Sequence, residues 1–119
     1  MLFRSARDYF ARSKSQKRLA RVRVAKDPTE ELFHAVAGFV ADKLHIEEPG
    51  MTSVDAKAAI ARRGLPSELA VSVEKILRAC ERARYAGVQL SEAELGALLD
   101  AAVQAMDTLE DVLKKGGGQ

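Results

Sequence analysis

Apolar side chains recur every three or four residues from residue 27 to residue 115, and this helical spacing constrains the fold most. No segment alternates apolar and polar residues with a period of two, and no Asn-Gly or Asp-Gly pair marks a hairpin. The sequence therefore predicts an all-α fold. The last apolar pattern is the longest and comprises Leu95, Leu98, Leu99, Ala102, Met106, Leu109 and Leu113.

Helix start and stop signals divide residues 27–115 into helices. Pro28 suits a first helical position, and Gly87 suits the residue that ends a helix. Three capping patterns place an acid three positions after a short polar residue: Asp27 with Glu30, Thr52 with Asp55, and Ser91 with Glu94. We expect a compact bundle of four helices over 27–115, preceded by a basic juxtamembrane-type helix within 1–26 and followed by a disordered glycine tail at 116–119.

The core of this bundle is expected to be aliphatic and rich in alanine. Within residues 27–115 the only aromatic side chains are Phe33, Phe39 and Tyr85. The single cysteine, Cys80, excludes a disulfide framework and suits a reducing compartment. It lies on the apolar face of its helix, where a buried thiol is usual, although nearby arginines favour the reactive thiolate.

The charges of the chain are divided between its two parts. Residues 1–26 carry nine basic side chains and one acid, a net charge of +8, whereas residues 27–119 carry a net charge of −6. A basic arm on an acidic body indicates contact with an anionic partner. The candidate membrane or polyanion contacts are Arg4, Arg7, Arg12, Lys14, Lys17, Arg18, Arg21, Arg23 and Lys26.

Four interpretations of the arm stay open at this point. It is a juxtamembrane segment on anionic lipid, a solvated basic helix, a nucleic-acid-binding arm, or a mitochondrial presequence. We expect a helix over 5–26 whose thin apolar stripe, Leu19 and Val22, packs weakly on the bundle or stands away as a stalk. The longest uncharged run, residues 32–41, is too short to span a membrane, but residues 1–3 are compatible with the end of a span upstream.

The body resembles the cytoplasmic C-terminal region of the bacterial BatD, or oxygen-tolerance, family. The resemblance covers about residues 17–112 and lies in patterned positions: the basic stretch 17–21, the segments 32–36 and 39–44, the unit 52–65, and the end of the last helix at 106–110. The clearest match is residues 76–87, a helix that ends in Cys-Glu-x-Ala-Arg-aromatic. Members of that family are longer and contain β-rich domains and a membrane span that this chain lacks.

The resemblance implies a non-catalytic interaction domain at the cytoplasmic face of the bacterial inner membrane. It would scaffold a complex with a von Willebrand A-type protein and a MoxR-type AAA+ ATPase. Arg82, Arg84 and Tyr85, at the end of the matched helix, are the candidate partner contacts. Arg84 falls on the apolar stripe, and we expect its stem to lie beside a carboxylate of the last helix.

The alternative is a soluble, helical, nucleic-acid-associated protein with a basic arm, located in the cytoplasm. An acidic body without aromatic stacking platforms argues against nucleic acid as a partner. Residues 52–86 are arranged as helix-turn-helix, but the second helix begins with acidic and apolar residues where base-reading side chains belong. His34 and His45 lack metal-ligand spacing, and no catalytic constellation follows from the sequence, so we expect no enzyme, metal or cofactor.

Overall fold

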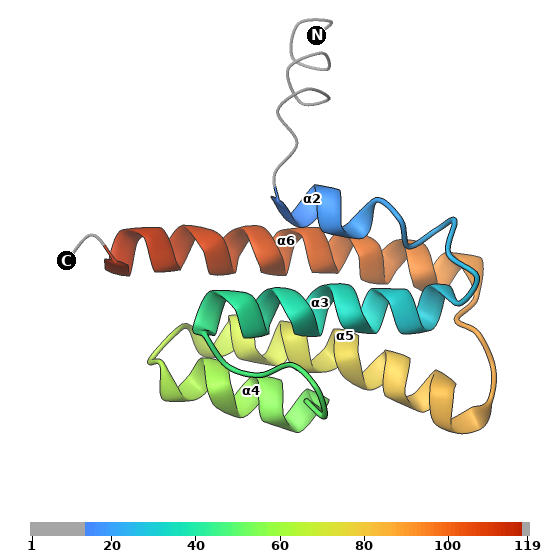
Figure 1. The fold of residues 1–119 in the computed structure, drawn as a ribbon, viewed down its shortest axis with the longest axis horizontal. Helices are drawn as coiled ribbons and strands as arrows, with labels where there is room; N and C mark the ends of the chain where they lie inside the picture. Colours follow the sequence, from blue (N-terminus) through green and yellow to red (C-terminus); the bar gives the residue numbers. More distant parts are fainter. Residues whose placement is uncertain (1–13, 118–119) are drawn as a thin grey trace, which may run out of the picture.

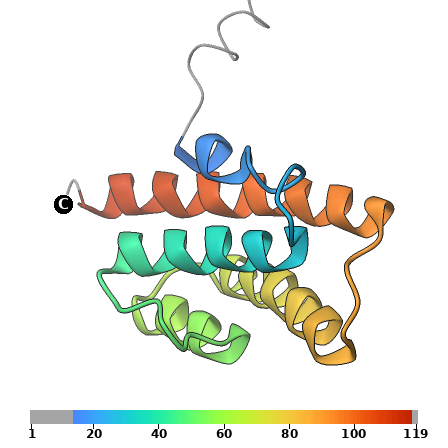
Figure 2. The same cartoon turned by 45° about the vertical axis from the view of Figure 1, so that its right-hand side comes forward.

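Helix α3, Pro28–Leu44, lies at the centre of an all-helical bundle. The computed structural model describes residues 14–117, and in this range the other helices are α2 (Lys14–Leu19), α4 (Ser53–Arg62), α5 (Ser67–Ala86) and α6 (Glu92–Gly117). Helix α5 runs antiparallel to α3 and α6 and packs against both, while α4 packs on α5 and α3 (Figures 1 and 2). The predicted four-helix bundle and all-α class are confirmed, with α2 as an additional short helix.

Helix α3 is buried around most of its circumference and not on one face alone. Its large apolar residues, such as Leu32, Val36 and Phe39, are in the core as the sequence predicts. Ala35, Ala37, Gly38 and Ala41 are also buried, because neighbouring helices cover the remaining sides. A helix that is apolar or small all round is typical of a central position. The core is aliphatic and alanine-rich, as predicted.

The predicted caps position the helix ends. Asp27 Oδ1 accepts a hydrogen bond from the Glu30 amide at 3.0 Å. The reciprocal capping boxes are complete at α4 and α6, where every bond between side chain and backbone is 3.1 Å long: Thr52 with Asp55 and Ser91 with Glu94. Gly87 ends α5 with a φ of 73°, a left-handed conformation that favours glycine.

The segment before α3 differs from the sequence prediction in length and in packing. Within the described residues the helix ends at Leu19, and residues 20–26 form successive turns with i→i−3 hydrogen bonds. Leu19 and Val22 are buried, Val22 completely, although we expected weak packing. The turns keep these two side chains, which are three positions apart, on the bundle side, where their burial stabilises the docked segment. Helix α2 consequently lies directly on α6 and α3 (Figure 1).

Helix α6 also differs from the prediction, because it continues through Gly117. The first two glycines of the expected tail, Gly116 and Gly117, are therefore helical. Their N–H groups complete the last turn, which needs only backbone atoms. The last two residues of that expected tail lie outside the described residues.

Candidate functional site

The arm cations that the structure describes fall into two groups. Arg4, Arg7 and Arg12 lie outside the described residues, and so does the side chain of Lys14. Arg18 and Arg23 face the bundle and form ion pairs with it. Lys17, Arg21 and Lys26 are exposed, and none of them forms an ion pair among residues 17–115.

The two bundle-facing arginines lie over glycines of the helices beneath. Arg18 pairs with Asp42 of α3, and a Cβ at Gly38 would come within 2.9 Å of its Nη1 atom. Arg23 Nη1 lies 3.7 Å from Glu92 of α6, and a Cβ at Gly96 would be 3.4 Å from its Nη2 atom. Gly38 thus leaves the Arg18 guanidinium space that a Cβ would take, whereas a Cβ at Gly96 would be in ordinary van der Waals contact with Arg23.

The described part of the arm exposes positive charges and one large apolar side chain, that of Val24. Val24 is 83% exposed, whereas Val22, two residues earlier, is fully buried. Lys17 and Arg21, together with Arg18 and Glu31 of α3, line a surface hollow of about 450 Å³. The sequence did not predict that Glu31 would line this hollow, or that Val22 would be buried and Val24 exposed. The Val-x-Val spacing, which favours opposite orientations in non-helical backbone, was the only available signal for the valines.

The end of α5 positions Arg84 differently from the prediction. Its Nη1 donates to Glu30 of α3 at 2.6 Å, and its guanidinium lies 4.6 Å from the centre of the Phe33 ring. The carboxylate partner therefore comes from α3, and the expected pairing with the last helix is wrong. Tyr85 is 97% exposed and Arg82 is exposed as well. Of the three candidate partner contacts, Arg84 is held within the fold and two face outward.

His34 also contacts Glu30, the partner of Arg84, at the surface. Its Nδ1 lies 2.8 Å from Glu48 and its Nε2 lies 2.8 Å from Glu30. These hydrogen bonds, that of Glu48 first, raise the pKa of His34 above its ordinary value. The hydrogen bond from Arg84 lowers the pKa of Glu30 below 4.5. His45, in contrast, ends α3 in a left-handed conformation, and within residues 14–117 no His, Cys, Asp and Glu cluster could hold a metal ion.

These shifts predict a pH-dependent stability. The contribution of His34 is complete below about pH 6.5 and is lost as the pH rises through its raised pKa. That of Glu30 is complete above pH 4.5 and is lost as the pH falls through its lowered pKa. Both side chains are more than a third exposed, so solvent screening limits the effect to about 0.5 kcal/mol.

Urea unfolding at about pH 6 and about pH 9 tests this expectation. Wild type should lose about 0.5 kcal/mol more than His34→Gln between these two values. An equal loss in both proteins would show that His34 does not contribute.

Cys80 is fully buried in the core, as predicted from its position on the apolar face. Burial raises the pKa of its thiol to about 12, and the opposing effect of Arg84 is smaller. The thiolate is the form that reacts, so the arginines do not activate this cysteine at neutral pH.

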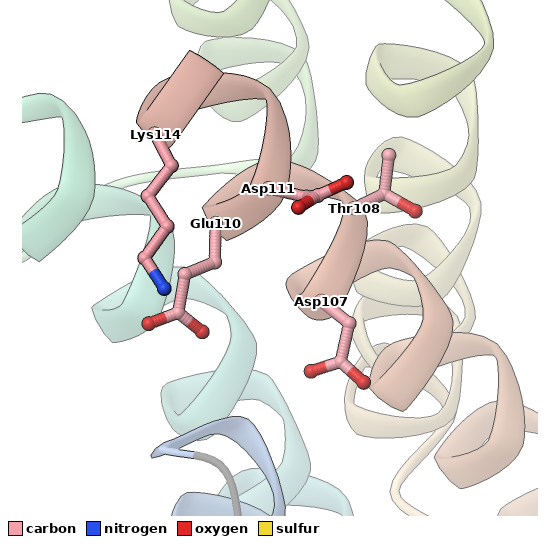
Figure 3. A pocket seen from close by; sticks show the side chains of 5 residues that line it. All are labelled: Asp107, Thr108, Glu110, Asp111 and Lys114. Carbon is pink, nitrogen blue, oxygen red and sulfur yellow. The ribbon is translucent and has the colours of Figure 1, made fainter. Parts of the chain in front are cut away.

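The C-terminal half of α6 presents an acidic hollow of about 400 Å³ (Figure 3). In the close-up the side chains of Lys114 and Glu110 point toward one another, with Asp111 and Thr108 on another side of the helix. Glu110 also accepts from Lys43 of α3 at 3.3 Å. The two hollows share no lining residue, but they are linked through Lys43, which binds Glu110 and lies, like Arg18, over the Phe39 ring.

A further contact that sequence reasoning missed fixes the start of α3. Gln89, in the loop before α6, accepts from the Thr29 hydroxyl at 2.9 Å and donates to Asp27 at 3.0 Å. The Leu90 amide donates to the same Thr29 hydroxyl at 3.1 Å. The junction between the arm and the bundle is therefore held by hydrogen bonds to the α5–α6 loop.

Comparison with known proteins gives no assignment: no family model, curated protein or solved structure matches this chain. In the part of the chain that the structure describes, none of the helices combines the length and apolar character that crossing a membrane requires. What the fold and surface define is a small all-α bundle with a docked basic segment.

Proposed function

We propose that this chain is a non-catalytic interaction domain that works at the cytoplasmic face of a bacterial membrane. The observation that carries the proposal is the two-sided arm. Arg18 and Arg23 attach it to the bundle, and Lys17, Arg21 and Lys26 face outward. An anionic membrane attracts each nearby cation by about 1 kcal/mol, so these outward charges favour contact with lipid.

The exposed valine supports lipid over other polyanions. Val24 lies between the outward cations in sequence and is almost fully accessible. An apolar side chain among cations suits a membrane interface, where acyl chains lie beneath the phosphates. Contact with nucleic acid phosphates would gain nothing from this residue.

The proposed protein partner comes from the resemblance to the BatD family. A von Willebrand A-type protein or a MoxR-type AAA+ ATPase would bind the side of the bundle away from the lipid. Tyr85, Arg82 and the 57% exposed Val88 support a contact at the end of α5. Tyrosine and arginine are enriched at the energetic centres of protein interfaces.

Sedimentation with vesicles tests the membrane part of the proposal. Wild type should bind vesicles that contain anionic lipid, and should bind purely zwitterionic vesicles much less. The combined variant Lys17→Gln, Arg21→Gln, Lys26→Gln removes three cations and about 3 kcal/mol of attraction, which corresponds to up to about a hundredfold weaker binding.

A charge-matched control separates location from total charge. Arg62→Gln, Lys75→Gln, Arg82→Gln removes three exposed cations from α4 and α5, which α2 does not contact. This control should bind vesicles nearly as well as wild type. Equal weakening in both variants would contradict a directed contact, and salt-sensitive binding to RNA or DNA without vesicle binding would favour the nucleic-acid alternative.

A further inference from the structure

The basic hollow differs from a plain cationic surface in one respect, because a carboxylate contributes to its lining. The described residues around it are Lys17 and Arg18 of α2, Arg21 of the following turn, and Glu31 of α3. Its volume is about 450 Å³, and it is widely open to solvent. Three cations with one acceptor form a mixed donor set, which constrains the ligand more than charge alone does.

The fold holds one cation of this hollow in place, together with the backbone that carries the other two. Arg18 is fixed by its ion pair with Asp42, and its guanidinium lies 5.8 Å from the centre of the Phe39 ring. Leu19 and Val22 are buried, so they anchor the backbone that carries Lys17, Arg18 and Arg21. The held Arg18 guanidinium loses less conformational entropy when an anion binds, whereas the exposed side chains of Lys17 and Arg21 must still be ordered.

Glu31 determines which anion fits. It is half-buried in the first turn of α3, and among the described residues it is the only acid that lines the hollow. A carboxylate repels phosphate, but it accepts hydrogen bonds from hydroxyl groups. A ligand that carries a phosphate at one end and hydroxyls at the other would satisfy both kinds of group.

We propose that the hollow binds the headgroup of a phospholipid whose phosphodiester carries a hydroxyl-bearing substituent, as in phosphatidylglycerol. Lys17 and Arg21 bind the phosphodiester, Arg18 lies beside them while paired with Asp42, and Glu31 accepts from the headgroup hydroxyls. This inference rests on the proposed membrane function and adds lipid selectivity to it. Val24, exposed on the same segment, lies close to the apolar region beneath the headgroups.

The test compares two lipids of equal charge. Phosphatidylglycerol and phosphatidylmethanol both carry one phosphodiester charge, but only the first has headgroup hydroxyls. At the same lipid fraction and ionic strength, wild type should bind phosphatidylglycerol vesicles about fivefold more tightly, the effect expected of one retained hydrogen bond.

Substitution of the acid should remove the preference. Glu31→Ala deletes both the acceptor and a repelling charge, so its binding to phosphatidylmethanol vesicles should rise and the two affinities should become equal. Glu68→Ala is the matched control, because Glu68 occupies the first turn of α5 as Glu31 occupies that of α3. This variant should keep the fivefold preference, and circular dichroism of both variants confirms folding.

The outcomes distinguish the headgroup site from the broader proposal of membrane binding. Equal binding of wild type to both lipids, or an unchanged preference in Glu31→Ala, would overturn the headgroup site and leave the membrane function intact. No binding to either vesicle would overturn both. Glycerophosphoglycerol in free solution that bound as tightly as the vesicles would replace the lipid with a soluble phosphate ester.

Discussion

Phe39→Ala is expected to lower the free energy of unfolding by about 3–5 kcal/mol. Phe39 is 1% exposed at the centre of α3 and is among the largest fully buried side chains. Removing its ring leaves a cavity in a core whose other members are mainly aliphatic and cannot fill the space. Urea unfolding followed by circular dichroism measures the loss.

The comparison with Phe39→Leu separates the contribution of apolar packing from that of the cation–π contacts. Leucine keeps most of the apolar volume but removes the ring that lies 5.8 Å from Arg18 and 5.5 Å from the Lys43 ammonium. We expect a loss of about 1–2 kcal/mol for leucine, since cation–π contacts at exposed sites contribute about 0.5–1 kcal/mol each. A loss below about 1 kcal/mol in the alanine variant would contradict the central position of this ring.

Val22→Asp should release the arm while the bundle stays folded. Val22 is fully buried beneath the arm, and its burial contributes roughly 1.5–3 kcal/mol. An unpaired carboxylate is costly to bury, so the substitution favours the undocked arm by more than the lost apolar burial alone. Hydrogen exchange of the turn amides at Val22, Val24 and Ala25 should become at least about tenfold to a hundredfold faster.

The matched control lies two residues further along the chain. Val24→Asp introduces the same charge into the same segment at a site that is 83% exposed. It should leave the exchange of the arm amides nearly unchanged, and the amides of α5 should stay protected in both variants. Similar acceleration in the two variants would indicate a general effect of charge and would contradict docking through Val22.

Local signals in the sequence predicted the helices and most of their ends. The Thr52 and Ser91 capping boxes and the glycine stop at Gly87 depend on residues a few positions apart, so the sequence contains each complete motif. The same logic failed for Glu30. Only half of the capping pattern of Asp27 with Glu30 forms: Asp27 accepts from the Glu30 amide, but the Glu30 carboxylate pairs with Arg84, which is 54 positions away.

The features that define the candidate site depend on packing between distant segments. Helix propensity gave no indication that the arm would turn after Leu19 or that Val22 would be completely buried against the bundle. The sequence showed that the arm is basic, but it did not show which cations face the bundle and which face outward. Asp42 and Glu92 select which arginines face inward, and the absence of a Cβ at Gly38 makes room for one of them.

Because the arm is docked, the bundle lies close to any surface that the outward cations bind. No stalk intervenes among the described residues, because α2 lies directly on α6 and α3 (Figure 1). Helices are about 10–12 Å in diameter, and electrostatic screening at physiological salt acts over about 8 Å. The carboxylates of Asp55 on α4 and Glu68 on α5 belong to helices that α2 does not contact. A negative surface that attracts the arm is therefore largely screened from these two acids, whereas Asp42 and Glu92, which lie beside the arm, are paired with its arginines.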